Sequence, residues 1–332
     1  MSQIRIDRVQ PPAALPGGEF TIRGTNLSGD PRSEILFGDA LGTMVIGSSN
    51  LVIARVPEAL SYGDLTLRLN AETSNAYHCA IGIQLADSLH PVSNPTCDAD
   101  GNIYTTFSGS RGQKSAVSVY KIDLNHDCRP FASDIVNATG LAFGPDSKLY
   151  VSSRNDGTIH QVSATGEVKT FIEGMGIATG IAFDPAGNLY VGDRSGTIFK
   201  IGPDREVFVF ATLEPSIAAY HLAFGPDSHL YVTGPTTSSF DSIQRIASDG
   251  GIELYFRGLG RPQGLAFDRD GNLYAAASHG GRRGILRIDR ERHATHFLSG
   301  HNIVGLCFLP SRSLAVATNN AIYRVDVDIA GA

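Results

Sequence analysis

Short apolar segments alternate with turns along most of the chain, and one pattern returns at a nearly constant interval. In the copy that begins at Gly140, an apolar triplet is followed by a Gly-Pro-Asp turn and then by Leu-Tyr-Val. Six copies can be aligned on one position, which is occupied by Tyr104, Tyr150, Tyr190, Tyr231, Tyr274 and Ala315. The interval is 40–46 residues, which is typical of repeat proteins built from one supersecondary unit per copy.

Each copy is predicted to contain four strands. The apolar triplet and the Leu-Tyr-Val segment are the first two, and a segment such as Ile159–Val162 is the third. A fourth strand is expected around the aromatic residues Phe131, Phe171, Phe208, Phe256 and Phe297. Four strands in about 40 residues are typical of a propeller blade, so the sequence predicts an all-β protein with a six-bladed β-propeller of four-stranded blades.

The last copy has no fourth strand of its own, because only a few residues follow Val325. The segment 80–86 has a suitable apolar pattern and is predicted to close the ring by pairing with the last blade. An unclosed ring would leave two exposed sheet edges. Removal of residues 1–88 is therefore expected to destabilise the propeller, whereas removal of residues 1–74 is not.

The first part of the chain has strands without this repeat, at residues 17–27, 34–38, 51–57 and 63–69. We predict two domains, an N-terminal immunoglobulin-like β-sandwich at 1–79 and the propeller at 80–332. The order of these N-terminal strands resembles the IPT/TIG domains, which implies a spacer, an adhesion module or a dimerisation surface. The repeated phrase Gly-Ile-Ala-Phe-Asp-Pro-x-Gly-Asn-Leu-Tyr-Val resembles the NHL repeat and the gluconolactonase-like propellers over residues 90–328.

The second resemblance implies where a ligand would bind. Gluconolactonase-like enzymes hold a divalent metal at the mouth of the central channel, with carboxylates and amides from the start of the innermost strands. The residue eleven places before the aligned tyrosine is Ser93, Thr139, Thr179, Tyr220, Gln263 or Val304. None is acidic, and a hard cation needs several anionic oxygens. No metal and no other cofactor is therefore expected, with only Asn94 and Asn137 as nearby amides.

The candidate ligand contacts at this channel mouth are polar residues near the start of the first strands. They are Asn94, Asn137, Thr139, Thr179, Tyr220, His221 and Gln263. His221 is also a candidate general base, because it replaces the glycine of its repeat. The alternative is a polar histidine that lines the channel without a catalytic role, since the sequence shows no carboxylate partner for it.

Basic residues in the loops between second and third strands are predicted to share the same face. Arg154, Arg194 and Arg282 are the main candidates, with Arg111 and Arg283 beside them. They could attract an anionic ligand, because the planar guanidinium can donate two hydrogen bonds to a carboxylate or phosphate. Ordinary solvated surface charge explains the same pattern.

Composition limits the remaining classes. The chain has 27 basic and 33 acidic residues, a formal net charge of −6, and no basic block, which disfavours nucleic acid as a partner. No apolar run is long enough to span a membrane. The start of the chain lacks a leader pattern, which predicts the cytoplasm, or the cell exterior if a leader was removed. The four cysteines form no Cys-x-x-Cys pair and are expected to be buried thiols.

These observations favour a ligand-binding or interaction protein that uses the channel-mouth face of the propeller. Its partner is expected to be a small polar or anionic ligand, or a protein. The alternative is a gluconolactonase-like hydrolase, or a lyase, that acts on a small lactone or ester at the same place. The missing ring of carboxylates favours the first interpretation.

Overall fold

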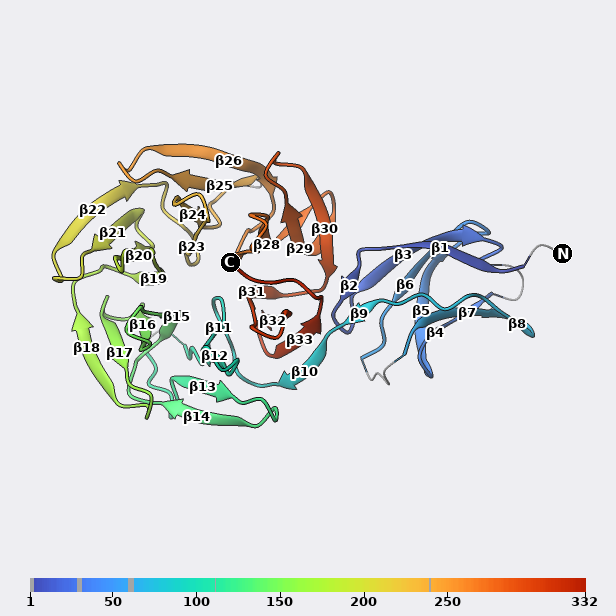
Figure 1. The fold of residues 1–332 in the computed structure, drawn as a ribbon, viewed down its shortest axis with the longest axis horizontal. Helices are drawn as coiled ribbons and strands as arrows, with labels where there is room; N and C mark the ends of the chain where they lie inside the picture. The colour runs from blue at the N-terminus through green and yellow to red at the C-terminus, as the bar shows by residue number, and fades with distance from the viewer. Residues whose placement is uncertain (1–2, 29–31, 59–62, 111, 239) are drawn as a thin grey trace.

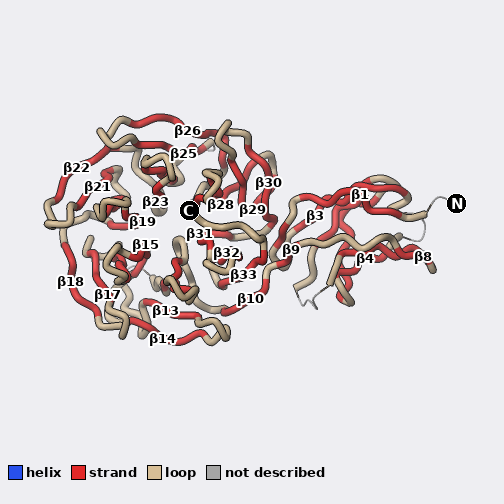
Figure 2. The backbone as a smooth tube through the Cα atoms, viewed as in Figure 1, coloured by secondary structure: helices blue, strands red, loops and turns tan. Residues whose placement is uncertain are grey.

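The structure is a computed structural model that describes residues 3–28, 32–58, 63–110, 112–238 and 240–332. Within these residues every regular element is a β-strand. Figure 1 shows a ring of small sheets with an elongated group of N-terminal strands on one side, and Figure 2 shows that strands and loops alternate throughout the chain. No helix that could cross a membrane occurs in the described parts of the chain.

The N-terminal strands form one seven-stranded sheet in the order β1-β3-β6-β5-β4-β7-β8. Their bounds are Arg5–Gln10 (β1), Glu19–Thr25 (β3), Glu34–Phe37 (β4), Ala40–Gly47 (β5), Leu51–Arg55 (β6), Leu65–Leu69 (β7) and Glu72–Thr73 (β8). The long strand β5 pairs with β6 on one side and with β4 on the other, and its register shifts between Met44 and Ile46. The two halves of the sheet can therefore fold over a shared core.

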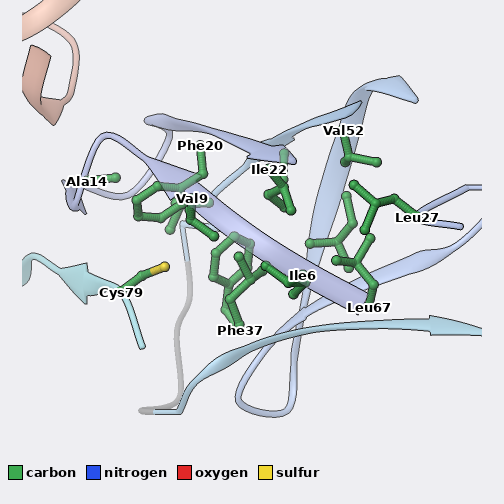
Figure 3. Close-up of a cluster of buried hydrophobic side chains, with 14 of the residues drawn as sticks. Ile6, Val9, Ala14, Phe20, Ile22, Leu27, Phe37, Val52, Leu67 and Cys79 are labelled. Carbon is green, nitrogen blue, oxygen red and sulfur yellow. The ribbon is translucent and has the colours of Figure 1, made fainter. Parts of the chain in front are cut away.

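That core is made by the alternate side chains that face inward from both halves. Phe20 of β3 and Phe37 of β4 are completely buried, and their ring centroids lie 6.0 Å apart. Ile6, Ile22 and Leu67 surround them (Figure 3). The alternation of buried and exposed residues in β3 and β7 is the two-residue period of a half-buried strand.

Five sheets of four strands each make up most of the ring. The first two are β11 (Thr96–Cys97), β12 (Ile103–Thr106), β13 (Val119–Ile122) and β14 (Cys128–Ala132), then β15 (Ala138–Phe143), β16 (Leu149–Ser153), β17 (Ile159–Val162) and β18 (Val168–Ile172). The next two are β19 (Ala178–Phe183), β20 (Leu189–Asp193), β21 (Thr197–Ile201) and β22 (Val207–Thr212), then β23 (His221–Phe224), β24 (Leu230–Thr233), β25 (Asp241–Ile246) and β26 (Ile252–Leu259). The fifth sheet is β31 (Ile303–Phe308), β32 (Ser313–Thr318), β33 (Ile322–Asp326) and β10 (Ile83–Ala86). The arrangement is a β-propeller, and β11, β15, β19, β23 and β31 are its innermost strands (Figure 1).

The repeat around Tyr274 departs from the predicted set of six equal blades. Its strands are β27 (Leu265–Phe267), β28 (Leu273–His279), β29 (Arg282–Ile288) and β30 (Ala294–Ser299). Two strands from the N-terminal part, β2 (Ala13–Ala14) and β9 (Ala80–Ile81), extend this sheet to six strands by parallel pairing. Five four-stranded blades are therefore present instead of six, because the outer edge of this sheet is covered by other parts of the chain.

The predicted closing segment 80–86 is divided between two sheets. Ile83 and Gln84 of β10 pair with Arg324 and Tyr323 of β33, as a ring-closing strand should. Ala80 and Ile81 instead pair with β2, so this part of the prediction is wrong. The chain changes sheets at Gly82, where an added Cβ would lie 2.5 Å from Leu15 Cδ2.

Leu15 follows β2 and packs into the propeller, although it comes from the N-terminal part of the sequence. Its side chain is 2% exposed and belongs to the apolar cluster of Tyr274, Leu298 and Val325. Its backbone N–H donates to Ser299 O at 2.8 Å. The expectation that residues 1–74 can be removed without cost to the propeller therefore conflicts with the packing.

The repeat tyrosine makes the same contacts in five of the six repeats, which explains why this residue recurs. The Tyr274 ring lies edge-on against Phe297 of its own sheet and Phe308 of the next, with centroids 4.9 and 5.0 Å away. Its hydroxyl donates to Asp268 Oδ2 at 3.1 Å. Equivalent tyrosine–aspartate bonds join Tyr104 to Asp98, Tyr150 to Asp146, Tyr190 to Asp184 and Tyr231 to Asp227.

The predicted fourth strands are present around Phe208 in β22 and Phe256 in β26, but other aromatic residues of these strands pack against the repeat tyrosines. Phe210 and Tyr255, instead of Phe208 and Phe256, contact the repeat tyrosines. Phe208 is 53% exposed. Both outer strands pair across a register shift, and a shift of one residue turns a side chain to the opposite face of the sheet.

Candidate functional site

A cavity of about 340 Å³ lies where the innermost strands meet. It is lined by residues of or next to β11, β15, β19, β23, β27 and β31, many of them phenylalanine or leucine, and by Gly331 and Ala332 of the C-terminal segment. Figure 1 shows this end of the chain at the centre of the ring. Ala332 N donates to Phe267 O at 3.1 Å, which holds the segment against β27. The volume lies near the lower end of the range for small-molecule sites.

Two of the predicted ligand contacts, Asn94 and His221, occupy the same position of the repeat and line this cavity. Ten places before the aligned tyrosine, four repeats carry glycine at Gly140, Gly180, Gly264 and Gly305. The other two repeats carry Asn94 and His221 there, and these two line the cavity together with Gly140 and Gly180. The glycines leave no room for larger residues, since a Cβ on Gly180 would lie 2.4 Å from Tyr220 O. Asn94 and His221 therefore project where the other repeats have only backbone.

Asn94 uses its whole amide within the protein. Its Nδ2 donates to Leu265 O at 2.9 Å, and its Oδ1 accepts from Leu306 N at 3.0 Å. The side chain thus joins β27 to β31 from a third repeat. Its predicted place at the channel agrees with this geometry, but its amide is engaged in holding the ring together.

His221 begins β23 and is 2% exposed, yet it lines the cavity. Its Nε2 has no hydrogen-bond partner among the described residues. Burial lowers the pKa of the imidazole to about 4, against a smaller opposite effect of a hydrogen bond with the Gln263 side chain. At neutral pH the ring is therefore uncharged. Most buried polar atoms form a hydrogen bond, and leaving one without a partner costs about 1–3 kcal/mol of stability. The Nε2 atom of His221 is therefore an unusual feature of the cavity.

Most of the residues eleven places before the tyrosine are hydrogen-bonded or packed within the propeller itself. The Thr179 hydroxyl donates to Gly192 O at 2.9 Å and accepts from Tyr220 N at 3.1 Å. The Thr139 hydroxyl donates to Asn137 O at 2.9 Å. Tyr220 is buried in an apolar cluster, and its hydroxyl donates to Glu214 O. Of this predicted ring, Gln263 is the residue that reaches the cavity histidine.

Asn137 is buried and stabilises a loop of the preceding repeat. Its Oδ1 accepts from Gly112 N at 2.7 Å, and its Nδ2 donates to Gly109 O and Ser110 O at 3.0 Å each. It has a positive φ of 50°, which asparagine tolerates better than most residues. These bonds satisfy the amide without any ligand.

The predicted basic residues lie on the face where the innermost strands begin. Arg154 and Arg194 directly follow Ser153 and Asp193, which pair with the first residues of β15 and β19. Arg154 donates to Gly109 O at 3.2 Å and Arg194 to Ser216 O at 3.1 Å, so each reaches a loop of a neighbouring repeat. Arg282 and Arg283 are exposed at the β28–β29 turn. Arg111 lies outside the described residues.

Among the described residues, no aspartate or glutamate lines the cavity. In the part of the chain that the structure describes, no three His, Cys, Asp or Glu side chains form a group that could hold a metal ion. The chemistry available at the cavity is therefore that of a neutral imidazole beside an amide and backbone groups.

Comparisons with known proteins support the two architectural classes. Residues 5–80 match the model of the IPT/TIG domain family. The search of curated proteins finds no match for the chain.

Solved structures with the same fold differ in their functions. A gluconolactonase from Xanthomonas campestris is 16% identical, with 74% of this chain and 89% of that chain covered and a TM-score of 0.60. A virginiamycin B lyase from Staphylococcus aureus is 15% identical, with 74% and 98% covered and a TM-score of 0.54. An auxiliary nutrient binding protein from Bacteroides ovatus is 11% identical, with 98% of each chain covered and a TM-score of 0.56. At these identities the likeness shows the fold alone.

Proposed function

We propose that the protein binds a small polar ligand in the central cavity of the propeller, with His221 as the main contact. The observation that carries the proposal is the His221 Nε2 atom, which is buried, has no partner among the described residues and belongs to a side chain lining a cavity. A polar ligand atom would remove the cost of leaving this nitrogen unsatisfied.

The Gln263 contact indicates which kind of group the ligand presents. The hydrogen bond with Gln263 raises the pKa of His221, as expected when the amide oxygen accepts from the ring. In the neutral ring, a proton held at Nδ1 leaves Nε2 as an acceptor. The ligand would then donate an O–H or N–H group, as sugars, sugar acids and amides do.

The basic residues of the same face extend the proposal to an anionic ligand. Arg194 and Arg282 are exposed, while Arg154 is partly buried. Exposed ion pairs contribute only about 0.2–1 kcal/mol each, so several must act on one ligand to matter. In this proposal Tyr220, Thr139, Thr179, Asn94 and Asn137 shape the site through the backbone that they hold.

Two architectural proposals accompany this function. We treat the six-stranded sheet as the sixth blade, so that six repeats surround the cavity as in a six-bladed propeller of the NHL type. We place the domain boundary at residues 79 and 80, although β2 crosses it to reach the propeller. The IPT/TIG domain then acts as a spacer, or as a surface for a protein partner.

A hydrolase or lyase is the second candidate. The observation in its favour is again His221, because a neutral imidazole held by a second polar side chain can act as a general base. The gluconolactonase and the lyase among the similar structures have the same fold. Opening of D-glucono-1,5-lactone, followed at pH 7 with wild-type protein and with His221→Gln, separates the two candidates. Turnover that the variant loses supports the enzyme, and saturable binding without turnover supports the binding protein.

If His221 binds the ligand, substitution of this residue should lower the affinity of the protein for it. In a thermal-shift panel of monosaccharides, sugar acids and small amides, at least one compound should raise the melting temperature of the wild-type protein. His221→Phe should lower the affinity for that compound about tenfold, which corresponds to the loss of one buried hydrogen bond. Gln161→Leu, on the outside of the same propeller, is the matched control and should leave affinity unchanged. No stabilising compound, or equal affinity in His221→Phe, would contradict the proposal.

Gluconate and glucose test the role of Arg154 and Arg194, because the two compounds differ in charge and are similar in size. Replacing both Arg154 and Arg194 with glutamate should lower the affinity for gluconate more than the affinity for glucose. Added salt should have the same effect on the wild-type protein. Equal changes for the two compounds would show that the arginines act only on the loops that they contact.

A further inference from the structure

The contact between the sheets of the first and last repeats is built differently from the others. Elsewhere a repeat tyrosine packs against a phenylalanine at the end of the next innermost strand, as Tyr274 does against Phe308. At the ring closure the tyrosine position holds Ala315, and the phenylalanine position of the first repeat holds Cys97. Small residues thus replace two rings at the place where the chain closes on itself.

Cys307 fills part of the resulting space. It lies in β31, one residue before Phe308, so its side chain has the opposite orientation to Phe308 and faces the first repeat. Cys97 and Cys307 belong to the same apolar cluster as Ala315. The Cys97 thiol donates to Phe308 O at 3.4 Å, and the Cys307 thiol is hydrogen-bonded to Cys97. The two thiols therefore interact within this cluster.

The backbones around this pair are held close together. Leu306 N donates to Asn94 Oδ1 at 3.0 Å, and a Cβ on Gly305 would lie 2.4 Å from Asn94 Cα. Both cysteines are partly exposed, and Cys307 lines the central cavity. The expectation that all four cysteines are buried is thus wrong for Cys97, Cys128 and Cys307, and only Cys79 is fully buried.

We propose that Cys97 and Cys307 form a reversible disulfide that covalently closes the propeller ring. The oxidant would be a small disulfide such as oxidised glutathione. The Cys97 thiolate attacks one sulfur of the oxidant and releases one thiol, and Cys307 then attacks the Cys97 mixed disulfide and releases the second. Two protein thiols are oxidised, one disulfide is reduced, and the two protons pass to the released thiols.

The order of attack follows from the surroundings of the two sulfurs. Accepting a hydrogen bond from Cys307 lowers the pKa of Cys97, whereas the same bond and burial raise the pKa of Cys307. The thiolate is the nucleophile, so Cys97 reacts first. Because nearly the whole propeller lies between the two residues, the link would strongly restrict the unfolded chain.

The test exposes the full-length protein to increasing ratios of oxidised to reduced glutathione. Free thiols are then alkylated in denaturant, and the non-reduced digest is analysed by mass spectrometry. We expect the thiol count to fall from four to two, a cross-linked peptide that joins Cys97 to Cys307, and a rise in melting temperature of roughly 5–10 °C. A reductant should reverse all three changes.

Matched variants separate this link from other oxidation. Cys97→Ser and Cys307→Ser should each abolish the cross-link and the thermal gain, whereas Cys128→Ser, in the same cluster, should retain both. Four unreacted thiols at the highest ratio would overturn the proposal. So would a link from Cys97 to Cys128, or a glutathione adduct on Cys97 that Cys307 does not displace.

Discussion

Truncation of Leu15 to alanine is expected to lower the free energy of unfolding of the propeller by about 2–5 kcal/mol, the usual cost of a large-to-small change in a packed core. Leu15 comes from the N-terminal part of the chain but packs between Gly82 and Gly300, against side chains of the last two repeats. Chemical denaturation followed by tyrosine fluorescence measures the effect.

Leu41→Ala is the matched control for this change, because Leu41 is 62% exposed in the N-terminal sheet. It should alter stability by no more than about 0.5 kcal/mol. Removal of residues 1–74 should destabilise the propeller at least as much as Leu15→Ala, since it also removes β2. A propeller of unchanged stability in both proteins would show that the N-terminal segment only rests against it.

Acidification is expected to destabilise the wild-type protein through His221 by about 3 kcal/mol. The pKa of this histidine is about 4 in the folded protein, below the value of 6.5 for an unperturbed side chain. Between these pH values the unfolded chain binds a proton that the folded chain does not, so the free energy of unfolding falls as the pH falls. The loss begins near pH 6.5 and is complete near pH 4.

The matched protein for this experiment is His221→Gln, which cannot bind the proton. Other groups titrate in both proteins, so the informative quantity is the difference between their unfolding free energies at each pH. The difference should change by about 3 kcal/mol between pH 7 and pH 4. Parallel curves for the two proteins would contradict a buried, neutral His221.

The repeat could be predicted from sequence because its strongest signal has a structural cause. Each repeat tyrosine packs between two aromatic rings and donates to an aspartate in the preceding turn, so residue types and spacing recur together. Of the two strands that enlarge the sheet of Tyr274, β9 lies in the segment 80–86 that was predicted to be a strand, whereas β2 had no such signal. Ala13 and Ala14 pair in parallel with residues far away in sequence, and two alanines carry no strand periodicity.

Of the predicted ligand contacts, Asn94 and His221 line the cavity, whereas Thr179 and Tyr220 are held within the propeller. Alternate residues of a strand point to opposite faces, so counting eleven places before the tyrosine selects side chains packed into the scaffold, such as Thr179 and Tyr220. The position ten places before it was visible as a column of glycines interrupted by Asn94 and His221. That Asn94 is fully hydrogen-bonded and His221 is not depends on three-dimensional contacts alone.

The ¹⁵N chemical shifts of the His221 ring show whether a ligand binds at this histidine. They are recorded at pH 7 in the free protein and after saturation with the panel compound that raises the melting temperature most. The account predicts a neutral ring in both states, with a marked change at Nε2 and little change at the nitrogen that bonds to Gln263. An Nε2 shift that stays the same in the saturated protein would contradict a ligand site at His221.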